Sequence, residues 1–329
     1  MKKSEKEISI KKSSVWEILV RKRETSVIAA TLILFFIFTT TEGFLSSYNI
    51  FNVSRTAALF IFIAIAQSMV IMIGGMNVSL GAIGGLTAIC FGYMVQELGF
   101  NTMVALIISL LLGMILGAVN GFIITKFKIN AFVTTLATSF VFTGLVYGIS
   151  KGNAYNKIPE SYTLLGRKGI MGLPYLFWLA VAMLILMAYI FRFTVFGRRL
   201  FATGGNADAA RMSGINTQRM VVIANTLSGL MAAIAGALTV SWLGMASPGT
   251  GVDWMMNSFA VAVIGGTALS GGSFSAIGML FSGFLIALVK NGLVMLGVNV
   301  YLEQTFLGLI ILGAVMLESI REKYLRNQK

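Results

Sequence analysis

The stretch RTAALFIFIAIAQSMVIMIGGMNVSLGAIGGLTAICFGYMVQE, residues 55–97, decides the class of fold. No charged residue lies between Arg55 and Glu97. About 20 apolar residues suffice for a helix to cross the ~30 Å hydrocarbon core of a bilayer, and one such run fits on each side of the glycine pair at 74–75. In the whole chain of 329 residues, 57% are hydrophobic and 11% are charged, whereas a soluble domain carries about 25% charged residues. We therefore expect an integral membrane protein.

Similar apolar runs continue through the rest of the chain. They predict about ten membrane-spanning helices, at residues 26–42, 55–74, 79–97, 102–125, 131–150, 173–192, 218–243, 255–270, 275–297 and 302–320. Glycine-rich segments interrupt two pairs of spans, the second with the third and the eighth with the ninth. The fold class is an all-α polytopic membrane protein with two glycine-broken helix pairs. The transmembrane domain covers 26–320, between a basic N-terminal segment, 1–25, and a tail, 321–329.

The distribution of lysine and arginine predicts the orientation. Basic residues gather in cytoplasmic loops, and ten spans put the clusters at 2–23, 126–128, 192–219 and 321–329 on one side. Both termini are therefore expected in the cytoplasm. The loop 151–172 lies outside and, with four basic residues, is the one segment that opposes the rule. The net charge of +13 is explained by the basic residues that set the membrane orientation. No nucleic-acid partner is expected, because the chain has no soluble module with a basic face.

The residue inventory excludes much chemistry. The chain has no histidine, Cys90 is its one cysteine, and no G-x-x-x-x-G-K-[ST] sequence is present to hold ATP. An intramembrane enzyme would need clustered acids, histidine or cysteine at membrane depth, and an ion-coupled carrier would normally show buried acidic or histidine relays. We expect a transport subunit without catalytic residues, metal or cofactor. Lys290 lies within a span, and we expect it to extend to the interface, while Asp253 is expected to be solvated at a span end.

The most informative polar segment is FGRRLFATGGNADAARMSGI, residues 196–215. Asn206 is a favourable N-cap residue, alanines follow it, and Gly214 can adopt the left-handed conformation that ends a helix. These residues predict a capped helix of about two turns on the cytoplasmic face. Because so short a helix is marginal by itself, it needs something to pack against. The two alternatives for that packing surface are lipid headgroups and a cytoplasmic partner protein.

The two glycine-rich segments that interrupt the helix pairs, called the first and the second break, are similar in sequence. IGGMNVSLG at 73–81 resembles IGGTALSGG at 264–272. Interrupted spans at matching positions of two halves indicate a transport pathway, although small residues also allow close helix packing. The glycines at 113, 117 and 121 predict such a packing face. Candidate residues of the translocation pathway are Asn77, Ser79, Gly265, Gly266, Ser270 and, in the ninth span, Asn291.

These motifs together resemble those of the permease subunits of bacterial sugar ABC importers of the ribose type. VIGGTALSGG at 263–272 is similar to the VIGGTSLSGG element of that family, and GGMNVSLG at 74–81 to its first glycine element. KNGLVMLGV at 290–298 resembles its NNGLNLLGV stretch, with Lys290 in place of the commoner asparagine. The segment 197–215 looks like its cytoplasmic signature. The likeness covers roughly residues 50–320.

The resemblance implies a subunit of an importer in the bacterial cytoplasmic (inner) membrane. A second permease copy or a paralogue completes the pore, an extracytoplasmic binding protein delivers a sugar, and a cytoplasmic ABC ATPase engages a coupling helix. The residues expected in that contact are Gly204, Gly205, Asn206, Ala210, Arg211 and Gly214. Ribose or a related monosaccharide is the expected substrate, with autoinducer-2 or another small polar solute as the alternative and an ion-coupled secondary carrier as a further one. Branched-chain amino acid permeases are more distant relatives of the same architecture.

Overall fold

The computed structural model describes residues 23–269 and 271–299, with scattered residues up to 316. The described chain is almost entirely helical. In chain order its elements are α2 (Arg23–Phe38), α3 (Ser47–Ile71), α4 (Leu80–Gln96), α5 (Thr102–Phe127), α6 (Ala131–Ser150), α7 (Glu160–Arg167), β1 (Gly169–Ile170), β2 (Leu173–Pro174), α8 (Tyr175–Phe193), α9 (Val195–Gly205), α10 (Ala207–Met212), α11 (Thr217–Leu243), α12 (Trp254–Ile264) and α13 (Ala276–Met295).

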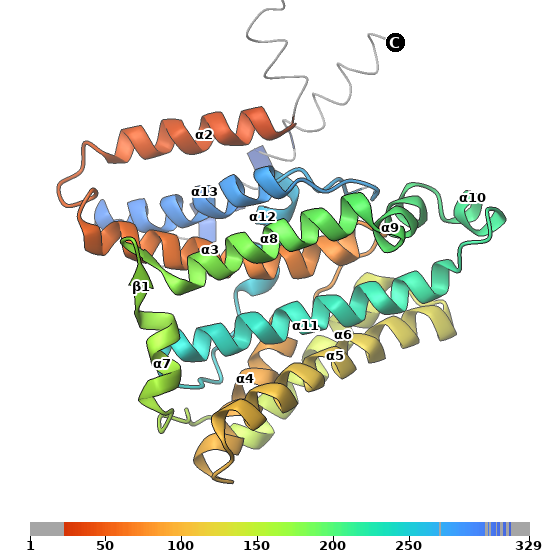
Figure 1. Ribbon diagram of the computed structural model, residues 1–329, viewed down its shortest axis with the longest axis horizontal. Coiled ribbons are helices and arrows are strands. Elements are labelled where there is room, and N and C mark those ends of the chain that lie inside the picture. Colours follow the sequence, from red (N-terminus) through yellow and green to blue (C-terminus); the bar gives the residue numbers. More distant parts are fainter. Residues whose placement is uncertain are drawn as a thin grey trace, which may run out of the picture.

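The predicted spans correspond to helices that run along the molecule (Figure 1). Within the described residues, α3, α5, α6, α8, α11 and α13 are each long and apolar enough to cross a bilayer. Three shorter apolar helices, Glu24–Phe38, α4 and α12, match the first, third and eighth predicted spans. The segment 1–22, most of the tenth predicted span at 302–320 and the tail 321–329 lie outside the described residues. The class of polytopic helical membrane protein is confirmed.

Two helix boundaries predicted from hydropathy are wrong. Helix α3 begins at Ser47 and not at residue 55, because the hydroxyl of Ser46 accepts a hydrogen bond from the backbone N–H of Asn49 (3.3 Å) and caps the helix ahead of the apolar run. Helix α12 ends at Ile264 and not at residue 270. Gly266, with φ of +92°, turns the backbone out of the helix there. The second break is therefore longer than expected and extends to residue 275.

Helix α3 forms the centre of the bundle, since 89% of its most apolar stretch is buried. In each of helices α5, α6 and α8, by contrast, only 28% of the most apolar stretch is buried. Such low burial is typical of helices that face lipid or a partner. The predicted glycine face of α5 is confirmed as a packing surface. A Cβ added to Gly117 would lie 2.2 Å from the carbonyl oxygen of Asn225 on α11, and one added to Gly113 would lie 2.5 Å from the side chain of Ala233.

Helix α7 and the antiparallel β1–β2 hairpin close one end of the bundle, and α9 and α10 lie at the opposite end (Figure 1). The sequence predicted only a loop at 151–172, whereas Glu160–Arg167 within it form α7. Its Tyr162 hydroxyl donates to the carbonyl of Ala237 (2.9 Å), and burial raises the pKa of this phenol, so that it stays protonated. Arg167 donates to the carbonyl of Leu243 at the end of α11 (3.2 Å). These contacts attach α7 to α11.

Candidate functional site

Helix α10 has the predicted caps at both ends. The Asn206 side chain accepts a hydrogen bond from the N–H of Ala209 (2.9 Å). At the other end Gly214 has φ of +81°, and the N–H of Ile215 donates to the carbonyl of Ala210 (3.0 Å), which is the Schellman arrangement. The prediction of a short capped helix is thus confirmed, with six residues in it.

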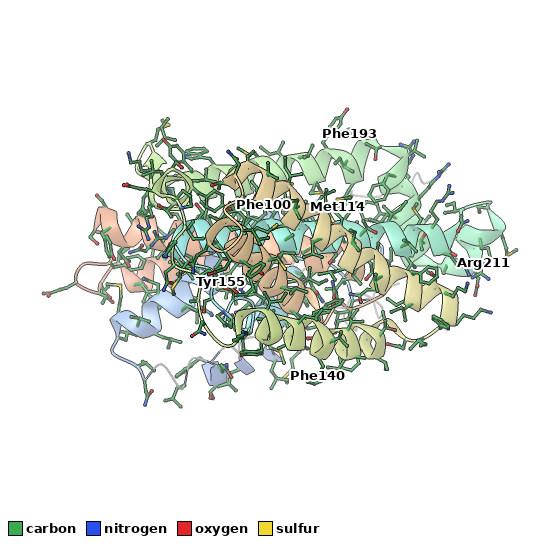
Figure 2. All side chains as sticks on the ribbon, turned by 90° about the horizontal axis from the view of Figure 1, so that it is seen from below. Phe100, Met114, Phe140, Tyr155, Phe193 and Arg211 are labelled. Carbon is green, nitrogen blue, oxygen red and sulfur yellow. The ribbon has the colours of Figure 1, made fainter. Side chains whose placement is uncertain are left out.

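The position of α10 leaves most of its surface free. Figure 2 shows Arg211 at the extreme end of the molecule, beyond the bundle. Met212 beside it is 89% exposed, whereas Ala210 is 4% exposed and faces back toward the bundle. An exposed methionine and arginine on a short capped helix are suited to contact another protein.

Helix α9, which leads into α10, was not predicted as a separate element. The Thr194 hydroxyl accepts from the N–H of Gly197 (3.2 Å) and caps its start. Leu200 and Thr203 are buried on its inner face. Gly204 continues this face, and a Cβ there would lie 1.7 Å from the carbonyl oxygen of Met72. Gly204 therefore lies against the first break rather than on an outward surface.

Gly205 differs from its neighbour in this respect. A Cβ added to Gly205 would meet nothing within 4 Å. Of the three glycines expected in the partner contact, Gly205 and Gly214 have open space around them, and Gly204 does not. The coupling role of all six residues named for that contact stays a prediction.

The first break, between α3 and α4, is held by a buried network of uncharged polar groups. The Asn77 amide oxygen accepts from the hydroxyl of Ser79 (2.8 Å) and from its N–H (3.1 Å), and the Asn77 amide nitrogen donates to Ser228 on α11 (3.0 Å). Asn120 on α5 donates to the Ser79 hydroxyl (2.7 Å). All four side chains are fully buried. In this conformation the predicted pathway residues Asn77 and Ser79 connect the break to α5 and α11.

A neighbouring helix fixes the same break from another side. The hydroxyl of Thr135 on α6 donates to the carbonyl of Met76 (3.1 Å) and accepts from the N–H of Val78 (3.0 Å). Sequence reasoning did not name Thr135 or Ser228. The available signal was that each is a polar residue within an apolar span, where an unpaired polar group is costly.

The second break, between α12 and α13, packs its backbone closely. A Cβ at Gly265 would lie 2.7 Å from the carbonyl oxygen of Val261 and 2.8 Å from the Ser282 hydroxyl. The hydroxyl of Thr267 lies 3.1 Å from that of Ser68 on α3. Ser270, a predicted pathway residue, lies outside the described residues. Gly265 and Gly266 therefore lie in a tightly packed turn.

Asn291, the remaining predicted pathway residue, is far along α13 from the breaks. It forms two hydrogen bonds with Asn49 at the start of α3, one donated by each amide (2.7 and 3.1 Å). Asn49 also lines a mostly apolar cavity of about 260 Å³ between α2, α3 and α13. The structure thus does not bring Asn291 together with Asn77 and Ser79.

The expectation for Lys290 and Asp253 was wrong in part. The Lys290 ammonium lies 3.3 Å from an Asp253 carboxylate oxygen and 5.1 Å from the centre of the Phe60 ring. Asp253 also accepts from Asn257 (2.8 Å), so this carboxylate is not merely solvated. The Lys290 ammonium therefore faces an aromatic ring and pairs with a carboxylate at the start of α12.

The bundle, the two broken helix pairs and the exposed helix α10 define a polytopic membrane protein of the transporter class. Residues 49–315 match the family described as branched-chain amino acid transport system, permease component. The chain belongs to this family. It is accordingly a multi-pass membrane permease of a bacterial ABC importer, a transport subunit that is not itself catalytic. Permeases of this family generally work with an ATPase and a binding protein.

Curated relatives match the chain over most of its length. The autoinducer 2 import system permease protein LsrC of Photorhabdus luminescens is 31% identical, covering 92% of this chain and 91% of its own. The ribose import permease protein RbsC of Escherichia coli K12 is 30% identical over 91% and 94%, and that of Bacillus subtilis 168 is 35% identical over 84% and 86%. No solved structure matches the chain.

Proposed function

We propose that this chain is the membrane permease of an ATP-driven importer that translocates ribose or a related monosaccharide. The similarity to ribose permeases, at 30 to 35% identity, supports the substrate class. The 31% identity to an autoinducer 2 permease makes that solute the alternative. Both are small polar solutes, and an uncharged network such as that of Asn77 and Ser79 suits hydroxyl-rich ligands better than ions.

Helix α10 is the single observation that carries the mechanism of this proposal. It is capped at both ends and exposed at one end of the bundle, and the chain has no nucleotide-binding motif. An ATPase that closes on ATP would contact α10, with Arg211 in the contact, and move it. The pore would then alternate between outward and inward access. Asn77, Ser79, Gly265, Gly266, Ser270 and Asn291 are the pathway residues we propose.

The topology we propose has ten spans and both termini in the cytoplasm, where α9 and α10 lie. A second permease copy, or a paralogue, completes the pore. Helices α5, α6 and α8, which are largely unburied within one chain, leave ample surface for that partner and for lipid.

Affinity purification from mildly solubilised native membranes tests this function. We expect an ATPase with a P-loop and a secreted binding protein to co-purify. The recovered complex, reconstituted in liposomes, should take up labelled ribose when ATP is supplied with the binding protein. Uptake of autoinducer 2 but not ribose would select the alternative substrate. Recovery of the chain alone, with uptake driven by an ion gradient without ATP, would contradict the proposal.

A further inference from the structure

Three backbone segments that are distant in sequence meet beside the last turn of α9. They are Met72 just after α3, Gly204 in α9, and Gly271–Gly272 between α12 and α13, and we call this set the glycine joint. The N–H of Gly272 donates to the carbonyl of Met72 (3.0 Å), so one hydrogen bond joins the first break directly to the second. Figure 1 shows α9 next to the loop that precedes α13. The joint therefore contains one segment from each break and one from α9.

No side chain separates the three segments. A Cβ on Gly204 would lie 1.7 Å from the Met72 oxygen and 2.9 Å from the Gly272 nitrogen. A Cβ on Gly271 would lie 2.8 Å from the Gly204 oxygen. Gly271 and Gly272 also have φ of +84° and +74°, a conformation that favours glycine. Because the three backbone segments are in direct contact, none of them can move without displacing the others.

Helix α10 is connected to the joint by a short, well-defined link. Asn206 is the only residue between α9 and α10: its N–H donates to the carbonyl of Ala202 (3.2 Å), and its side chain caps α10. The inner face of α9 is buried at Leu200 and Thr203, one turn or less from Gly204. A displacement of α10 is therefore transmitted to α9, and from α9 to the joint.

We propose that the glycine joint passes movement of α10 to both breaks at once, so that α9, Met72 and Gly271–Gly272 move as one body. Gly204 is then a positioning residue that acts by contact inside the permease, and it does not touch the ATPase. This inference rests on the proposed function, because it is the ATPase that displaces α10. Through the joint, two breaks far apart in sequence would respond together to one cytoplasmic helix.

Two helical glycines provide a matched pair of variants. Gly204→Ala inserts a methyl group into the joint, whereas Gly148→Ala on α6 inserts the same group where an added Cβ meets nothing within 4 Å. In the reconstituted complex we expect Gly204→Ala to lower uptake on the order of tenfold, as ordinary coupling energies allow, while the ATPase still co-purifies and hydrolyses ATP. Gly148→Ala should keep uptake within about twofold of wild type. Equal uptake by both variants in a working complex would overturn the proposed role of the glycine joint.

A distance measurement tests the same inference if Gly204→Ala fails to fold. In a Cys90→Ala background, spin labels at Met212 and Leu269 report the distance from α10 to the second break, and labels at Met212 and Ile115 report the distance from α10 to α5. All three labelled side chains are exposed. Between the nucleotide-free and the ATP-trapped complex, we expect the first distance to stay constant and the second to change.

The outcomes of this measurement are separable. A change in the Met212–Leu269 distance as large as that of Met212–Ile115 would overturn the joint, and so would two unchanged distances. A wild-type complex that retains no ATPase and takes up no sugar would instead overturn the proposed function, and the inference with it.

Discussion

At the scale of single residues, the Asn77 side chain organises the first break. It accepts from Ser79 and donates to Ser228, so it links the break to α11, and all three side chains are fully buried. Asn77→Ala would leave the Ser79 N–H and the Ser228 hydroxyl without partners. A buried unpaired group costs about 1–3 kcal/mol. We therefore expect a clear loss of stability, measured as the thermal unfolding midpoint of the purified permease in detergent.

The double variant Asn77→Ala with Ser228→Ala is the control for this prediction. Removing both partners leaves no unpaired Ser228 hydroxyl, so the second substitution should add less than it costs alone. Strictly additive losses would mean that the hydrogen bond between Asn77 and Ser228 contributes nothing.

The sequence could indicate this network only in part. Asn77 and Ser79 were identified because they stand beside a glycine pair within an apolar run. Ser228 and Thr135 lie about 150 and 60 positions from Asn77, and local pattern has no means of pairing such distant residues. The same limit applies to Gly204. A side chain there would clash with the backbones of Met72 and Gly272, which are distant in sequence.

At the scale of elements, prediction succeeded where a physical signal is local. Helices α5, α6, α8 and α11 follow long apolar runs and were predicted within about two residues, the usual uncertainty of helix ends. The caps of α10 are also local, since Asn206 and Gly214 act on their own neighbours. Helix α7 was missed because its stability comes from contacts with α11, and the end of α12 was misjudged because hydropathy does not distinguish helix from apolar turn.

The N-cap of α10 allows a test at this scale. Asn206→Ala removes the oxygen that accepts from Ala209 and should destabilise the helix by about 1 kcal/mol, a large effect for only six residues. We expect less ATPase to co-purify with this variant. Asn206→Ser keeps a capping oxygen and should retain more of the ATPase than alanine does. Equal retention by both variants would show that a preformed α10 is not required.

The contact between α5 and α11 offers a second test of an element. Gly117→Ala places a methyl group 2.2 Å from the Asn225 carbonyl oxygen. Overpacking of this kind costs about 1–3 kcal/mol, so the unfolding midpoint should fall. Gly144→Ala on α6 is the matched control, because a Cβ there meets nothing within 4 Å. If Gly144→Ala were equally harmful, loss of glycine itself and not the helix contact would be responsible.

At the scale of the whole molecule, the arrangement is one bundle with two different ends. The β1–β2 hairpin closes one end and carries Met171, which is 85% exposed. Helix α10 projects from the other end and carries Met212, which is 89% exposed. The count of basic residues predicted which loops lie on the same side of the membrane. The structure adds that α9 connects the end that carries α10 to both breaks.

The orientation of these two ends is directly measurable. In a Cys90→Ala background, Met171→Cys should react with a membrane-impermeant maleimide applied outside intact spheroplasts, because the hairpin lies outside in the proposed topology. Met212→Cys should react only after the membrane is permeabilised. Both positions are exposed, so a difference in labelling reports sidedness and not burial. The reverse pattern would put α10 outside the cell, where no ATPase could reach it, and the coupling role of α10 would fail together with the topology.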